Sequence, residues 1–81
     1  MDNKAVVIFK VEGKGIEKDL EIPLDITAND LVVALNKAYD LGIDTSLIRN
    51  CYLKSEHPIA LIRGNRPLSE FGVRNGTVIY F

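Results

Sequence analysis

Cys51 and His57 are the two side chains of this sequence that could act together as a nucleophile and its base. Alternation through residues 50–54 places Cys51 on the apolar side of an expected strand, where a thiol behaves as a small hydrophobic group. His57 falls in an expected turn, and no acidic side chain has an obvious position from which to orient its imidazole. We therefore predict a buried thiol, a solvated imidazole and no catalytic site, so the protein is not expected to be an enzyme.

Metal and phosphate chemistry have equally little support. One cysteine and one histidine do not fill a tetrahedral metal site, which takes four ligands. Gly13-Lys14-Gly15 is not followed by a helix N-terminus, so its glycines indicate a hairpin turn rather than a phosphate loop. The sequence predicts neither a metal nor a cofactor.

The composition sets outer limits on the fold and on its partners. The 81 residues are 47% hydrophobic and 26% charged, which predicts a single folded domain over residues 1–81, with disorder of residues 1–4 as an open alternative. A net charge of −1 gives no overall field that would attract nucleic acid. No apolar stretch approaches the roughly 20 residues that span a bilayer. We expect a cytoplasmic protein that neither inserts into membranes nor binds nucleic acid.

The charges are nevertheless unevenly distributed. Residues 12–48 carry eight acidic side chains and three lysines, whereas residues 49–81 carry five basic side chains and two glutamates. Scattered solvated charge is one interpretation, and a basic edge that faces an acidic partner is the other.

Five segments have the β-branched and aromatic composition of strands, and one segment is helical. The expected strands are Ala5–Val11, Glu17–Leu24, Ile48–Lys54, Pro58–Arg63 and Thr77–Phe81. Pro23 lacks an N–H donor, so the second strand is expected at an edge of the sheet.

The helix begins with a recognisable cap. Thr27 and Asp30 have the spacing of a capping box, in which each side chain bonds the other residue's backbone N–H. The apolar stripe is expected to comprise Leu31, Ala34, Leu35, Ala38 and Leu41. Gly42 is expected to close the helix in a left-handed conformation.

This order of elements resembles the β-grasp: an α+β fold with a mixed sheet of four to five strands and one helix packed across one face. The segment Pro67–Val73, which includes Leu68 and Phe71, resembles the elbow beneath the last strand of ubiquitin. The resemblance covers about Ala5 to Phe81 and implies a ubiquitin-like domain.

Two features narrow the resemblance within that superfamily. They are a hairpin over residues 50–63 longer than that of ubiquitin, and an end of the chain that is expected to be flush with the last strand; the segment Leu68–Val73 followed by Asn75-Gly76 accompanies them. Together they resemble the bacterial YukD/EsaB-like family associated with type VII (WXG100) secretion. The resemblance implies a non-catalytic, unconjugated accessory or regulatory protein whose partner is a cytosolic part of the secretion machine.

Two other functions remain open. A ubiquitin-like modifier or sulfur carrier reacts through a mobile Gly-Gly end, whereas Tyr80-Phe81 is bulky and expected to be held in the sheet. A weaker alternative is nucleic-acid binding through the arginines of the carboxyl half, which are Arg49, Arg63, Arg66 and Arg74.

Strand alternation also predicts which side chains face away from the helix. The expected inward residues are Val7, Phe9, Val11, Cys51, Leu53, Ile79 and Phe81. The expected partner-binding residues, which face outward, are Val6, Ile8, Tyr52, Val78 and Tyr80. Lys10, Lys54 and Arg49 are expected at their rim. A docking patch and ordinary strand composition explain the outward residues equally well, and a homodimer would use the same patch.

Overall fold

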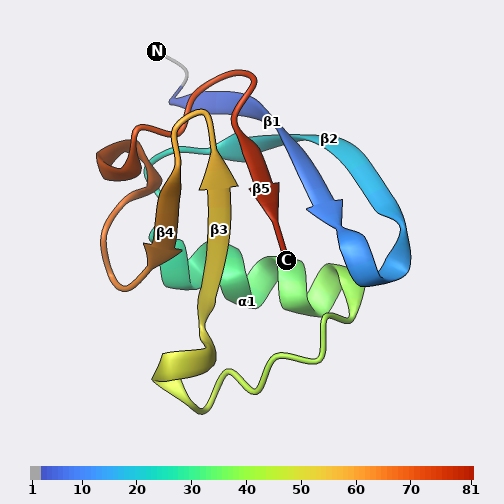
Figure 1. Cartoon of the computed structure of the whole chain (residues 1–81). Helices are drawn as coiled ribbons and strands as arrows, with labels where there is room; N and C mark the ends of the chain where they lie inside the picture. Colours follow the sequence, from blue (N-terminus) through green and yellow to red (C-terminus); the bar gives the residue numbers. More distant parts are fainter. Residues whose placement is uncertain (1–2) are drawn as a thin grey trace.

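The computed structural model describes residues 3–81 and contains five strands and one α-helix (Figure 1). The strands are β1 (Lys4–Val11), β2 (Ile16–Pro23), β3 (Tyr52–Glu56), β4 (Ala60–Arg63) and β5 (Val78–Tyr80). The helix is α1 (Ala28–Tyr39), and short 3₁₀ helices span Glu12–Lys14, Ile48–Asn50 and Leu68–Phe71. Disorder is an open alternative for residues 1–4. Residues 1 and 2 lie outside the described residues, whereas Lys4 pairs with Pro23 in the sheet.

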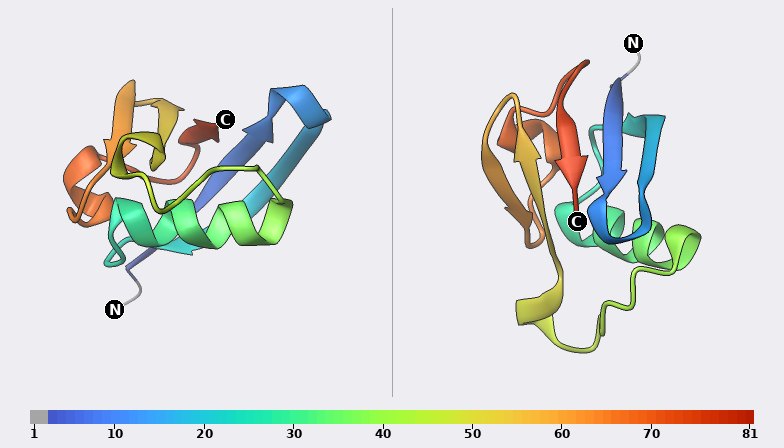
Figure 2. Two further views of the ribbon diagram at one scale, coloured as in Figure 1. Left: turned by 90° about the horizontal axis from the view of Figure 1, so that it is seen from below. Right: turned by 45° about the vertical axis from the view of Figure 1, so that its right-hand side comes forward.

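The strands form one mixed sheet in the order β2-β1-β5-β3-β4. β5 is parallel to β1, and the other neighbouring pairs are antiparallel. The helix α1 lies across one face of the sheet, and the opposite face carries no helix (Figures 1 and 2). This arrangement confirms the expected α+β, β-grasp fold, and β2 with its Pro23 lies at an edge as predicted.

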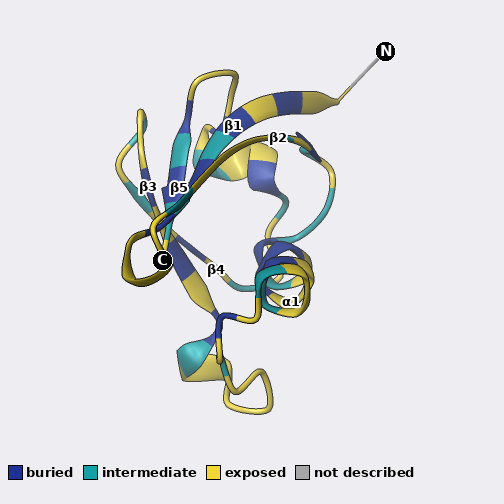
Figure 3. Cartoon of the chain, turned by 90° about the vertical axis from the view of Figure 1, so that its right-hand side faces the viewer, coloured by how far each residue is buried: buried dark blue, intermediate teal, exposed yellow. Residues whose placement is uncertain are grey.

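The core lies between α1 and the sheet, where buried and exposed positions alternate along the strands (Figure 3). The ring of Phe9 is fully buried and lies 5.0 Å from the ring of Tyr39, centroid to centroid. On α1 the predicted apolar stripe is only partly right, because Ala34 and Ala38 are exposed and Val32 is buried instead. The sheet therefore contacts a face of the helix rotated away from the two alanines, and the larger Val32 side chain fills the interior.

Both ends of α1 are fixed by side-chain bonds. The capping box is present as predicted: the Asp30 N–H donates to Thr27 Oγ1 (3.1 Å), and the Thr27 N–H donates to Asp30 Oδ2 (3.3 Å). At the other end, Gly42 takes the left-handed conformation predicted for it (φ 75°), but it does not close the helix, because the helix ends at Tyr39 and Asp40 is its left-handed cap with φ 53°.

Asn36 explains how the chain leaves the helix. Its side-chain amide bonds the backbone of Ile43 twice, as acceptor from the N–H and as donor to the carbonyl, both at 2.9 Å. These two bonds hold the connection after the helix against its last turns.

The third expected strand begins later than predicted. Residues 48–50 form a 3₁₀ turn closed by bonds from the Asn50 N–H to the Leu47 carbonyl and from the Cys51 N–H to the Ile48 carbonyl. These turn bonds occupy the backbone groups that a strand ladder would use, so β3 starts at Tyr52. The turn between β3 and β4 falls at residues 57–59.

β5 has three residues, yet its flanks extend the pairing with β1. The Ile8 N–H donates to the Thr77 carbonyl (2.9 Å), the Phe81 N–H to the Lys10 carbonyl (3.0 Å), and the Glu12 N–H to the Phe81 carbonyl (3.3 Å). The backbone of Phe81 is therefore held against β1 on both its donor and its acceptor side.

Thr77 ties the start of β5 to the turn between β3 and β4. Its side chain is fully buried; the hydroxyl donates to the His57 carbonyl (2.8 Å) and accepts from the Arg74 N–H (3.0 Å). One hydroxyl thus satisfies two backbone groups, one 20 residues away at His57 and one three residues away at Arg74.

We predict that Thr77→Val lowers the free energy of unfolding by about 1–3 kcal/mol, because both backbone partners lose their bond while the side-chain volume is preserved. Thr77→Ser is the matched control, since it keeps the hydroxyl and should retain more of the stability than Thr77→Val. Urea denaturation followed by circular dichroism measures both. Equal stability of Thr77→Val and the wild type would show that this hydroxyl does not secure the turn.

Candidate protein-binding surface

The five residues expected to bind a partner all lie on strands at the helix-free face. Val6 and Tyr52 are exposed, and Ile8, Val78 and Tyr80 are half-buried. In the ladder Ile8 is opposite Val78, so these two side chains are direct neighbours across β1 and β5.

Tyr80 occupies the centre of this face. It is opposite Lys10 on β1 and opposite Lys54 on β3, so an aromatic side chain lies between two lysines. Lys10 also approaches Glu17 of β2, with 3.7 Å between Nζ and Oε1. Among the residues that the structure describes, Lys54 forms no such ion pair.

Val6 is separate from the other four residues. It lies opposite Glu21, near the start of β1, and its N–H donates to Asn75 Oδ1 (2.8 Å) in the turn before β5. The structure thus brings Ile8, Val78, Tyr80 and Tyr52 toward one area and leaves Val6 at its margin.

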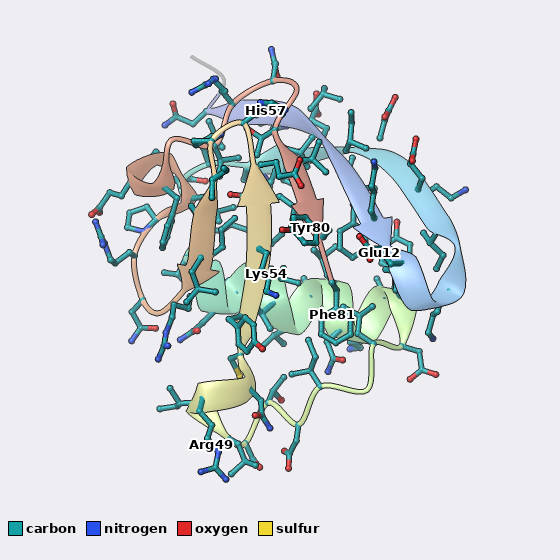
Figure 4. The ribbon with its side chains drawn as sticks, viewed as in Figure 1. Glu12, Arg49, Lys54, His57, Tyr80 and Phe81 are labelled. Atoms are coloured by element: carbon teal, nitrogen blue, oxygen red, sulfur yellow. The ribbon has the colours of Figure 1, made fainter. Side chains whose placement is uncertain are left out.

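Three hollows occur beside β3 and β5, and we call them upper, central and lower because their lining residues His57, Lys54 and Phe81 follow from top to bottom in Figure 4. The upper hollow, of about 390 Å³, is lined by Glu56, His57, Pro58, Ile59, Arg74 and Tyr80. The central hollow, of about 230 Å³, is lined by Glu12, Tyr52, Leu53, Lys54, Tyr80 and Phe81. The lower hollow, of about 290 Å³, is lined by Gly42, Ile43, Asp44, Asn50, Tyr52 and Phe81.

Phe81 belongs to this surface and not to the core, so the prediction that it faces inward to a buried position is wrong. Its side chain is 46% exposed and lines both the central and the lower hollow. Alternation assumes that the inner side is fully covered, but the connection at residues 42–44 leaves the Phe81 side chain partly open to solvent. Figure 4 shows Lys54, Tyr80, Glu12 and Phe81 around the central hollow, with Arg49 far below on the 3₁₀ turn.

Exposed apolar side chains continue from this area onto β4. Leu61 is opposite Lys54 in the ladder and is 46% exposed, and Ile59 in the preceding turn is 89% exposed. The sequence prediction omitted both residues. Alternation within the predicted strand Pro58–Arg63 already separates Leu61 from the buried Ile62, so the same rule identifies Leu61 as an outward residue.

Cys51 and His57 are placed as predicted and lie at opposite ends of β3. The Cys51 thiol is buried and contacts the carbonyl oxygens of Thr45 (3.6 Å) and Leu47 (3.5 Å), whereas His57 is exposed in the turn. With the five residues of β3 between them, at about 3.3 Å per residue, the two side chains are not in contact. Within residues 3–81 no cluster of three or more metal-ligating side chains occurs.

Asp44 at the lower hollow carries a perturbed carboxyl group. The Ser46 hydroxyl donates to Asp44 Oδ1 (2.6 Å), as does the Ser46 N–H (3.1 Å), and these bonds lower the pKa of Asp44 below its ordinary value. Because hydrogen bonds to the charged form favour it, Asp44 presents a stable negative charge near neutral pH.

The mixed five-stranded sheet, the single helix and the elbow before β5 define a ubiquitin-like protein. The C-terminal ubiquitin-like domain of mouse tubulin-specific chaperone e has a TM-score of 0.71 and 15% identity, over 98% of this chain and 84% of that one. The UBL domain of Plasmodium falciparum Dsk2 has a TM-score of 0.60 and 24% identity, over 95% and 96% of the two chains. These likenesses establish the fold.

The family follows from the sequence itself. The family model described as WXG100 protein secretion system (Wss), protein YukD, matches residues 6–81. The chain therefore belongs to the YukD family, a ubiquitin-like family tied to WXG100 (type VII) secretion, and the resemblance seen in the sequence is confirmed. No individual curated protein matches it. Within residues 3–81 no helix is long and apolar enough to cross a bilayer.

We predict that Ser46→Ala raises the pKa of Asp44 toward its ordinary value, since the hydroxyl bond is the largest cause of the lowered pKa. A carbon-detected NMR titration of the Asp44 carboxyl group measures the change. Ser69→Ala, which alters an exposed serine on the elbow, is the control and should leave the Asp44 titration as it is in the wild type. An unchanged titration in Ser46→Ala would contradict the assignment of the cause.

Proposed function

We propose that the protein is a non-catalytic interaction module of a type VII secretion system and that its helix-free sheet face binds a protein partner. The observation that carries this proposal is the grouping of half-exposed apolar and aromatic side chains around Tyr80, on a face that no other element of residues 3–81 covers. Contiguous exposed apolar area on a small protein commonly marks an interface, and tyrosine suits one because it combines area with a hydroxyl.

The proposed partner is a cytoplasmic component of the secretion machine, and the proposed role is accessory or regulatory. Family membership supports the link to secretion. A second copy of the chain is the competing occupant of the face, because a homodimer would bury the same apolar side chains.

The proposal also holds that the protein is not conjugated to targets. A carrier needs a backbone free to enter the active site of an activating enzyme, whereas the backbone of Phe81 is bonded to Lys10 and Glu12.

We predict that Tyr52→Ala and Ile8→Asp preserve the fold and abolish capture of the secretion partner. Tyr52 contributes an aromatic wall to two hollows, and Ile8 is the neighbour of Val78, so each change removes apolar area from the proposed interface. Circular dichroism checks the fold, and affinity capture from cells that express the secretion locus, read by mass spectrometry, checks binding.

Val33→Asp is the matched control for Ile8→Asp, because Val33 is 48% exposed on α1, away from the sheet face. It should capture the partner as the wild type does. Retained capture by both Tyr52→Ala and Ile8→Asp would refute the assignment of the face. The oligomeric state is measured by analytical ultracentrifugation. If the wild type sediments as a dimer and Ile8→Asp sediments as a monomer, the face binds a second copy of the chain instead.

The alternative function, a modifier or sulfur carrier, makes a different prediction. Its protein from native cells would carry an adduct at the carboxyl end, such as a thiocarboxylate or an isopeptide-linked target. We expect the intact mass to show no adduct, since the backbone around Phe81 is paired. An adduct seen by mass spectrometry would support the carrier function and refute the proposal that the protein acts unconjugated.

A further inference from the structure

The three hollows form a continuous series because neighbouring hollows share aromatic walls. Tyr80 lines both the upper and the central hollow. Tyr52 and Phe81 line both the central and the lower hollow. The three depressions therefore form a row, divided by aromatic side chains, that runs from the helix-free face to the connection after α1 at residues 42–44, and a ligand that fills all three must be elongated.

The row runs beside the outward side chains of β3, which follow one another at steps of two residues. Glu56 lines the upper hollow, Lys54 the central hollow, and Tyr52 the ridge between the central and the lower hollow. Two residues of a strand span about 6.6 Å, and alternate side chains of any extended peptide have the same spacing. A helix rises only about 5.4 Å per turn, so over two steps it falls short by about 2–3 Å.

The charges differ from one end of the row to the other. The upper hollow has the Arg74 guanidinium and the His57 imidazole beside Glu56. The lower hollow has the Asp44 carboxylate and no basic lining residue. The central hollow has three aromatic walls, with Lys54 on β3 and Glu12 at the start of the 3₁₀ helix that follows β1. A matching ligand is acidic at the Arg74 end, apolar in the middle and basic at the Asp44 end.

We propose that the face binds an extended segment of the partner protein that carries an acidic, an apolar and a basic side chain at alternate positions. The acidic side chain pairs with Arg74 in the upper hollow, the apolar side chain enters the aromatic central hollow, and the basic side chain pairs with Asp44 in the lower hollow. The inference rests on the proposed function, since it uses the same face, and adds the conformation and the chemistry of the bound segment.

Synthetic heptapeptides with blocked ends test the spacing. The alternating peptides have the pattern Thr-Asp-Thr-X-Thr-Lys-Thr, with X as Leu, Met or Phe, and are made in both chain directions. There are two control sets. The adjacent set has the same composition, with Asp, X and Lys next to one another. The helical set is longer and places Asp, X and Lys four residues apart, which is the spacing of successive turns of a helix. Binding to ¹⁵N-labelled full-length protein is measured by NMR titration. We expect at least one alternating peptide to bind at least tenfold more tightly than every control and to shift the amide signals of Lys54, Arg74 and Phe81.

A charge exchange tests the polarity. Arg74→Glu should weaken binding of the preferred alternating peptide about tenfold and should favour the version in which Lys replaces Asp. Lys37→Glu makes the same charge change on an exposed residue of α1 and should not alter the preference. Arg74 is exposed, and its bond to Thr77 uses its backbone, so the substitution leaves that bond available.

Three outcomes overturn the inference: no binding by any alternating peptide, equal or tighter binding by the adjacent or helical sets, and no reversal of preference in Arg74→Glu. The proposed function fails separately. If Tyr52→Ala and Ile8→Asp abolish partner capture while the alternating peptides show no advantage, the face binds a partner, but not as an extended segment of this pattern.

Discussion

The structure depends on the insertion of β5 between β1 and β3. A central strand must satisfy backbone groups on both sides, and β5 does so with three residues because its flanks contribute further bonds. The bonds of Thr77 and Phe81 to β1 extend the parallel pairing at each end, and the Gly76 N–H donates to the Val6 carbonyl (3.0 Å) before the strand begins. Without these contacts β1 and β2 would form a hairpin separate from β3 and β4, and α1 would have no continuous sheet to cover.

The same insertion couples the core to the surface. Ile79 points inward and is almost fully buried, so its neighbours Val78 and Tyr80 must face outward at the centre of the sheet. Tyr80 therefore reaches its position between Lys10 and Lys54 through the register that buries Ile79. The outward side chains can change without disturbing the packing beneath them, which lets the helix-free face diversify its chemistry on a constant scaffold.

The sequence predicted what depends on neighbours along the chain and missed what depends on tertiary contacts. The capping box of Thr27 and Asp30 is local, and strand alternation placed all five candidate residues on the helix-free face. Three features could not be found in this way. The burial of Val32 depends on the angle at which α1 meets the sheet, the exposure of Phe81 depends on what lies beyond the sheet, and the hollows arise from side chains of separate strands.

The edges of the sheet indicate why binding is better sought on the face than by addition of a strand. β2 is an eight-residue edge, and its outward side chains Glu17, Asp19 and Glu21 are all acidic, with Pro23 at its end. Charge and proline at an edge discourage pairing with another strand. β4 has only four residues and packs beside the elbow at residues 68–71, as Figure 1 shows. With one edge charged and the other short and flanked, the apolar area that remains open to a partner is the face around Tyr80.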